Sequence, residues 1–196
     1  MASSAQDIVG AYPQAGYDLA QKIVEVSNRL GIPDPGWLAN LINFETGGSF
    51  SPSTKNPTSS ATGLIQFISS TARSLGTTTS ALASMSAIAQ MDWVEKYLRQ
   101  YQYKGFSNPT DLYMAVFYPV AMGDPNYPFP SNVVAANSGI STPTEYAEKA
   151  NARSRLPTGL LGVAIPGTGG VRVLPVLMIS SVALLIGALA WWKFKK

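Results

Sequence analysis

The strongest constraint in this sequence is an uncharged stretch of twenty residues, 173–192, near its C-terminal end. An apolar segment of about this length spans a bilayer as one helix. Arg172 precedes it, three lysines follow it, and Trp191 and Trp192 stand where an interfacial aromatic belt is expected. A buried hairpin or core helix is the alternative, which the length and the flanking charges disfavour. The sequence therefore predicts a transmembrane helix at 173–192 and a basic tail at 193–196.

The charge of the chain is divided unevenly along its length. Residues 1–150 hold eight Lys or Arg and eleven Asp or Glu, whereas residues 151–196 hold six basic residues and no acid. Because the positive charge flanks the apolar stretch, it indicates a lipid bilayer as partner and no specific recognition of nucleic acid. Residues 156–172 contain five Gly and two Pro, which predicts a flexible linker.

Residues 1–155 are predicted to form one mostly helical head. An apolar stripe ends at Gly31, and a second helix is expected from the N-cap Asp34 to Glu45. Residues 46–69 are expected to form a loop with a short strand pair, which gives the head an α+β fold. Residues 119–141 are expected to be a second loop. Further helices are predicted around Ile88, Met91, Val94, Leu98 and Tyr101, from Asn108 to Tyr118, and after a capping box at Thr142 and Glu145.

The residue types that the chain lacks limit the kinds of catalytic and metal site that it can form. The chain has no cysteine and no histidine, so disulfide frameworks, zinc fingers and Ser-His-Asp triads are excluded. An enzyme with this composition must use a carboxylate, Tyr or Lys for acid–base chemistry. We expect neither a metal nor another cofactor.

Glu45 is the most informative carboxylate in the chain. It follows Leu38, Leu41 and Ile42 by seven, four and three residues, so it lies on the apolar face of its predicted helix, in the last turn. Burial and the negative end of the helix dipole both raise a carboxyl pKa there. Spacing alone equally allows a solvent-facing Glu at a helix end.

Glu45 is followed by Phe50, by the segment Gly-Leu-Ile-Gln at 63–66 and by Thr-Ala at 71–72. This order and spacing resemble the soluble lytic transglycosylases, a lysozyme-like family. The match comprises a Phe a few residues after the catalytic Glu, a Gly-Leu-Ile-Gln segment, and Thr-Ala. A weaker match places Tyr118 at a motif tyrosine, with Pro119 where the family has Asn. The matching residues are Glu45, Phe50, Gly63, Leu64, Gln66, Thr71 and Ala72.

The resemblance implies a lysozyme-like head with a cleft between a helical lobe and a small β-containing lobe. It implies that Glu45 is the catalytic acid, cleaving the MurNAc–GlcNAc bond of peptidoglycan and forming 1,6-anhydro ends. Gln66 would bind the sugars or, alternatively, brace its loop. Tyr118 would orient Glu45 or the N-acetyl group, or be core. Weaker candidates for substrate contact are Ser59, Ser60 and Phe67.

Two other functions stay open at this point. Pro119 in place of the motif Asn is compatible with an inactive structural or glycan-binding membrane protein. Within the enzyme class, a hydrolytic muramidase is the alternative to a transglycosylase.

The predicted membrane anchor indicates where the protein is located. The N-terminal residues show no secretory signal, and a lone C-terminal span leaves the head in the cytoplasm, away from peptidoglycan. We therefore expect a component of the membrane of a phage virion that digests the wall during entry, with capsid or vertex proteins as neighbours. The alternative is a bacterial inner-membrane enzyme that faces the periplasm.

Overall fold

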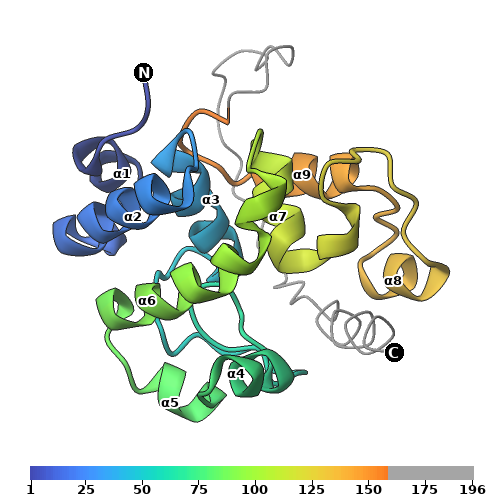
Figure 1. The fold of residues 1–196 in the computed structure, drawn as a ribbon, viewed down its shortest axis with the longest axis horizontal. Coiled ribbons are helices and arrows are strands. Elements are labelled where there is room, and N and C mark those ends of the chain that lie inside the picture. Colours follow the sequence, from blue (N-terminus) through green and yellow to red (C-terminus); the bar gives the residue numbers. More distant parts are fainter. Residues whose placement is uncertain (159–196) are drawn as a thin grey trace, which may run out of the picture.

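The helix α3 (Pro35–Glu45) lies at the centre of the computed structural model, which describes residues 1–158 (Figure 1). It packs against α2 (Tyr17–Leu30) on one side and against α7 (Pro109–Phe117) and α9 (Pro143–Asn151) on the other. The remaining helices are α1 (Ala5–Ala11), α4 (Ser69–Leu75), α5 (Thr79–Ala83), α6 (Ala87–Leu98) and α8 (Ser131–Ala136), with the 3-10 helices η1 (Pro13–Ala15), η2 (Arg99–Lys104) and η3 (Pro119–Ala121).

The predicted end of α2 at Gly31 and the predicted start of α3 at Asp34 are confirmed. In α2 the apolar stripe from Leu19 to Leu30 is buried, and Gly31 ends the helix with φ of 71°, a left-handed conformation that glycine adopts without strain. The side chain of Asp34 accepts a hydrogen bond of 2.8 Å from the backbone N–H of Gly36 at the start of α3. The next residue, Pro35, lacks an N–H and occupies the first helical position, where none is needed.

The head is helical as predicted, but the β part of the predicted α+β fold was wrong for the described part of the chain. Residues 1–158 are helical and contain no strand, and the expected strand pair is reduced to two isolated bridges, Lys55 to Thr62 and Thr62 to Phe67. Gly63 and Gln66 have φ of 87° and 53°. These left-handed residues turn the backbone too often for a ladder to continue.

Other differences lie where the sequence has little periodicity. Residues 119–141, expected to be a loop, contain η3 and α8. The short helix α1 precedes the expected apolar stripe and buries Ile8 in the core. Ile88, expected on the inner face of α6, is 41% exposed. A helix of one or two turns is not stable through its own residues and depends on tertiary packing, so its sequence shows no clear periodic pattern.

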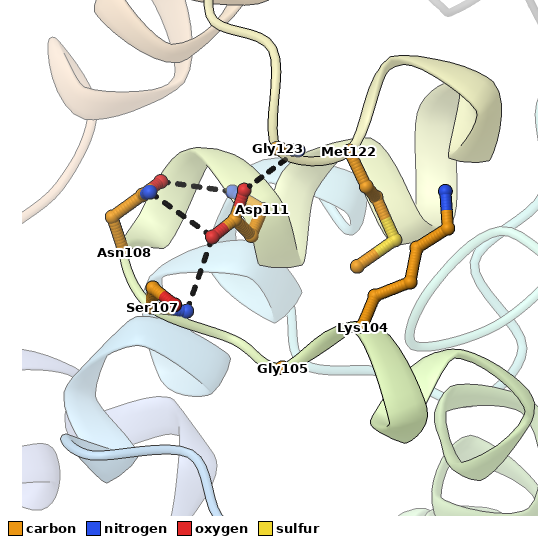
Figure 2. Close-up of a pocket in the computed structure, with 7 residues that line it drawn as sticks. All are labelled: Lys104, Gly105, Ser107, Asn108, Asp111, Met122 and Gly123. Carbon is orange, nitrogen blue, oxygen red and sulfur yellow. Dashed lines mark hydrogen bonds between the residues drawn. The ribbon is translucent and has the colours of Figure 1, made fainter.

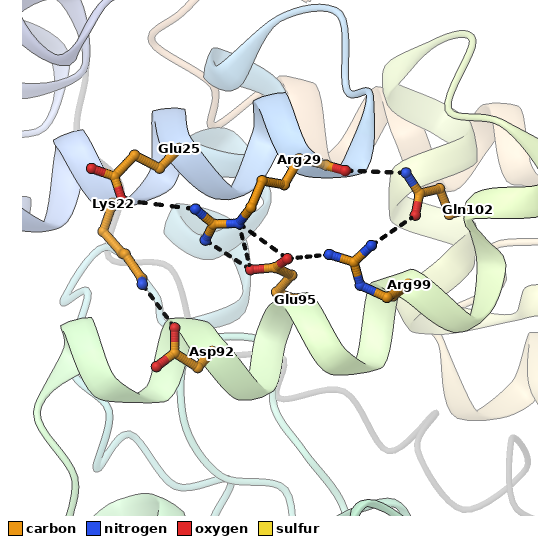
Figure 3. A network of polar contacts seen from close by, with 7 residues as sticks. All are labelled: Lys22, Glu25, Arg29, Asp92, Glu95, Arg99 and Gln102. Carbon is orange, nitrogen blue, oxygen red and sulfur yellow. Dashed lines mark hydrogen bonds and ion pairs between the residues drawn. The ribbon is translucent and has the colours of Figure 1, made fainter.

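Ionic contacts fasten α6 to α2 on the surface, as Figure 3 shows. Lys22 pairs with Asp92 at 2.8 Å, and Arg29 pairs with Glu95 at 2.8 Å. Arg99 also binds Glu95 from one turn further along the chain. Because the arginines and Asp92 are substantially exposed, such pairs contribute at most about 1 kcal/mol each.

The end of the described chain is fixed beside α3. The hydroxyl of Tyr12, a fully buried residue, donates to Asn40 Oδ1 at 2.6 Å and accepts from the N–H of Arg155 at 2.8 Å. Asn40 Nδ2 donates to the carbonyl of Leu156 at 3.2 Å, and the Leu156 side chain packs near Gly36. The folded head therefore continues through Leu156, near the end of α3 opposite Glu45.

The predicted membrane anchor is not part of the described structure. The predicted span at 173–192, the basic tail and the linker beyond Thr158 lie outside the described residues. Among the helices of residues 1–158, none combines the length and the apolar character needed to cross a membrane.

Candidate functional site

Glu45 occupies the last turn of α3, and the chain reverses immediately after it. Thr46 Oγ1 donates to the carbonyl of Ile42 at 2.7 Å and accepts from the N–H of Phe50 at 3.1 Å. The N–H of Gly48 closes the turn by donating to the carbonyl of Asn43 at 2.8 Å. This tight turn fixes the end of the helix, and the Glu45 side chain remains partly exposed.

A tyrosine that is distant from Glu45 in the sequence contacts its carboxyl group. The hydroxyl of Tyr146 on α9 donates to Glu45 Oε1 across 3.4 Å. The ring of Tyr146 stacks on Phe117 at 4.2 Å between centroids and meets Phe44 edge-on at 5.7 Å. Because Tyr146 is buried and held on two sides by rings, its hydroxyl is fixed toward the carboxyl.

Two further tyrosines, the half-buried Tyr97 and the buried Tyr113, lie close enough to Glu45 to interact with it electrostatically. Burial first, and then neighbouring groups that include Glu45, raise the pKa of Tyr97 well above its usual value and that of Tyr113 to about 12. Their hydroxyls donate to the carbonyl of Ala115 at 2.9 Å and to Asn151 Oδ1 at 3.0 Å. The groups that interact with the Glu45 carboxyl are thus neutral tyrosines.

These surroundings raise the pKa of Glu45 from 4.5 to about 8. Burial is the larger cause, and the hydrogen bond from Tyr146 opposes it by stabilising the carboxylate. Within residues 1–158 no basic side chain forms an ion pair with Glu45. At neutral pH this carboxyl group therefore retains its proton and can donate it to a bound molecule.

The loop after Glu45 is fixed from within by Gln66. Gln66 Nε2 donates to the carbonyls of Thr54 at 3.2 Å and Gly63 at 2.9 Å, and the residue is only 4% exposed. Of the two roles considered for Gln66, these contacts favour bracing of the loop.

A second glutamine, Gln90 on α6, fixes the same loop from outside. Gln90 is fully buried, and its Oε1 accepts from the N–H of Leu64 at 2.6 Å. Its Nε2 donates to the carbonyls of Pro52 at 3.0 Å and Leu82 at 2.8 Å. A Cβ on Gly63 would overlap the Gln90 amide, which explains a glycine at this position. No local pattern in the sequence indicates this role of Gln90.

The other predicted site residues lie in varied surroundings. Ser59 Oγ and Ser60 Oγ accept from the backbone N–H groups of Ala61 at 3.2 Å and Ser69 at 3.1 Å, so both brace their loop. Phe67 is buried and meets the Tyr97 ring edge-on at 6.1 Å.

The tyrosine that reaches Glu45 is Tyr146, whereas Tyr118 has other neighbours. The Tyr118 ring packs against Phe129 at 5.4 Å and Tyr127 at 5.9 Å. The sequence indicates the helix of Tyr146 through its capping residue Thr142. No local pattern indicates a contact between residues 101 positions apart.

A polar cavity of about 440 Å³ lies apart from these residues, between η2 and α7 (Figure 2). Its buried carboxylate, Asp111, accepts from the N–H of Ser107, the amide of Asn108 and the N–H of Gly123 at 3.0–3.1 Å. Asn108 caps α7 by accepting from the N–H of Asp111, and the Asp111 carboxylate ties Ser107 and Gly123 to the start of that helix, a structural role. In the described chain no group of three or more potential metal-ligating His, Cys, Asp or Glu side chains gathers.

Comparison with protein-family models, with curated proteins and with solved structures found no match to this chain. The observations that bear on function are therefore the surroundings of Glu45 and the spacing of the motif that follows it.

Proposed function

We propose that the head is a lytic transglycosylase that cleaves the glycan strands of peptidoglycan, with Glu45 as its acid and base. The observation that carries the proposal is a half-buried glutamate whose carboxyl pKa is raised to about 8, at the start of the matched motif. A general acid works best when its pKa lies near the operating pH.

The proposed reaction needs one carboxyl group. Protonated Glu45 gives its proton to the glycosidic oxygen between MurNAc and GlcNAc as the C1–O bond breaks. The substrate's N-acetyl group stabilises the cationic sugar. Glu45, now a carboxylate, accepts the proton of the 6-hydroxyl as O6 bonds to C1, which gives a 1,6-anhydro end and restores the acid.

Within residues 1–158 no second carboxylate is seen to act on Glu45, which supports this route over a two-carboxylate mechanism. A retaining hydrolase places its nucleophile about 5–5.5 Å from the acid. No Asp or Glu of residues 1–158 is among the groups that shift the pKa of Glu45. A hydrolytic muramidase that activates water remains the alternative within the enzyme class. An inactive glycan-binding or structural protein is the alternative outside it, and Pro119 in place of the motif Asn favours it.

We further propose that the domain is a lysozyme-like fold in which the loop of residues 46–68 takes the place of the β-containing lobe. The bracing of this loop by Gln66 and Gln90 supports the idea, because a binding wall must hold its shape without a sheet.

The hydrogen bond from the Tyr146 hydroxyl allows a test of whether Glu45 is the catalytic acid. Because its hydrogen bond lowers the pKa of Glu45, Tyr146→Phe is expected to raise that pKa further. The alkaline limb of the pH–rate profile for wall clearing, where the acid loses its proton, should then move to higher pH. One hydrogen bond contributes about 0.5–1.5 kcal/mol, so the alkaline limb should move by roughly 0.4 to 1 pH unit.

The matched control is Tyr118→Phe, which removes a hydroxyl that does not contact Glu45. Its alkaline limb should coincide with that of the unmodified protein. A shift to lower pH in Tyr146→Phe, or equal shifts in both variants, would contradict the assignment of the acid.

We propose that the protein resides in the membrane of a phage virion, with the head outside the bilayer and beneath the coat. The proposal rests on the predicted anchor. Protease should leave the head intact in whole particles and cleave it after the coat is removed. Absence from purified particles, or digestion of the head on intact spheroplasts, would instead support the inner-membrane alternative.

A further inference from the structure

Arg153 is attached to the helix turn that carries Glu45. It follows α9, and its carbonyl accepts from Asn43 Nδ2 at 3.1 Å. Its guanidinium group lies 5.6 Å from the centre of the Phe44 ring, a cation–π contact. Both the backbone and the side chain of Arg153 are therefore held against the last turn of α3.

The charge of Arg153 is not neutralised by the described part of the chain. Arg29 and Arg99 both pair with Glu95, whereas Arg153 forms no ion pair within residues 1–158. The residue is exposed, and its guanidinium donates no hydrogen bond to residues 1–158. Arginine is suited to binding a carboxylate with two parallel N–H donors.

Arg153 is close to Glu45 but does not act on it. The Phe44 ring beneath the guanidinium contacts Tyr146, whose hydroxyl reaches the Glu45 carboxyl. Arg153 is not among the causes of the Glu45 pKa shift. A ligand that extends from Glu45 past Tyr146 to the Phe44 ring would therefore meet a cation held on that ring.

We propose that Arg153 binds a carboxylate carried by the glycan strand, and so makes the site prefer anionic strands over neutral ones. This inference rests on the proposed function. Two sources offer that chemistry, the lactyl carboxyl group of peptide-free muramic acid and the carboxylates of its stem peptide. Neutral polymers of N-acetylglucosamine offer neither.

The test measures binding by the full-length protein in detergent, in a Glu45→Gln background that prevents turnover. The probes are peptide-free MurNAc–GlcNAc oligosaccharides, the same oligosaccharides with amidated carboxyl groups, and oligosaccharides that carry stem peptides. Arg153→Gln is expected to raise the Kd for at least one carboxylate probe by roughly tenfold, and to leave the Kd for the amidated probe unchanged. A change with the peptide-free probe identifies the lactyl group, and a change only with the third probe identifies the stem.

Arg155→Gln is the matched control. Arg155 lies two residues further along the same segment, but its guanidinium donates to the carbonyl of Ala11 and lies over the Tyr12 ring. It should leave all three Kd values unchanged. No change in Arg153→Gln, or an equal change with charged and amidated probes, would overturn the inference.

The outcomes also separate this inference from the proposed function. Binding that depends on Arg153 without any wall cleavage by the unmodified protein would reject the catalytic proposal alone. Cleavage with binding that does not depend on Arg153 would reject the carboxylate site alone.

Discussion

Replacing Glu45 with Gln is expected to abolish wall cleavage and also to make the folded head more stable at alkaline pH. Gln keeps the shape of the side chain but cannot deliver a proton, and loss of a general acid reduces rates by about 100- to 10,000-fold. Soluble fragments released from purified walls measure the loss. Circular dichroism confirms that the variant is folded.

The stability change follows from the raised pKa. Glu45 has a pKa of about 8 in the folded protein and 4.5 as its ordinary value, so folding disfavours the charged form. The unmodified protein therefore loses stability as the pH rises from about 4.5 through about 8, and Gln has no such dependence. Each pKa unit corresponds to about 1.4 kcal/mol. Because the side chain is partly exposed, we expect a gain on the order of 2 kcal/mol at pH 8.

Thermal unfolding of both proteins at pH 5 and pH 8 measures this difference. For a domain of this size, about 2 kcal/mol corresponds to a Tm increase of several degrees. The increase should be larger at pH 8 than at pH 5. A gain of equal size at both pH values, or a variant that is less stable at pH 8, would show that Glu45 is ionised in the folded protein.

Replacing Gln90 with Leu is expected to cause a large loss of stability. Leucine is similar in size but cannot bond the three backbone groups of Pro52, Leu64 and Leu82 that Gln90 holds. A buried polar group without a partner costs about 1–3 kcal/mol, so the free energy of unfolding should fall by about 3 kcal/mol or more. The loop that follows Glu45 should loosen as well, and cleavage should weaken.

Gln100→Leu is the control for Gln90→Leu, because Gln100 is exposed in η2, just beyond α6. It should change the free energy of unfolding by no more than about 0.5 kcal/mol. Urea unfolding of the two variants gives both values. If the two variants lost equal stability, the assigned contacts of Gln90 would not be the reason for its burial.

The sequence predicts those parts of the head whose signals are local. Helix boundaries are predicted well by Asp34 followed by Pro35 and by the apolar stripe that ends at Gly31. Caps and hydrophobic periodicity act within a few residues, so they do not depend on distant contacts. The structure follows them in α2 and α3. The position of Glu45 in the last turn of α3 could be predicted for the same reason.

The parts that could not be predicted depend on contacts between distant residues. The loop of residues 46–68 is held by the amides of Gln66 and Gln90 instead of a strand ladder, and no local pattern distinguishes those alternatives. Tyr146 approaches Glu45 only because α9 packs against α3 and α7. The raised pKa of Glu45 likewise depends on rings from separate helices. The spacing of apolar residues suggests a raised pKa, but the tertiary packing determines it.

The most direct test of the central claim is mass spectrometry of the fragments that the full-length protein releases from purified peptidoglycan, beside the Glu45→Gln variant. The account predicts muropeptides with 1,6-anhydro ends from the unmodified protein and no fragments from the variant. Fragments heavier by one water would show hydrolysis to reducing ends. Equal release by both proteins, or no release by either, would contradict the claim that Glu45 is a catalytic acid.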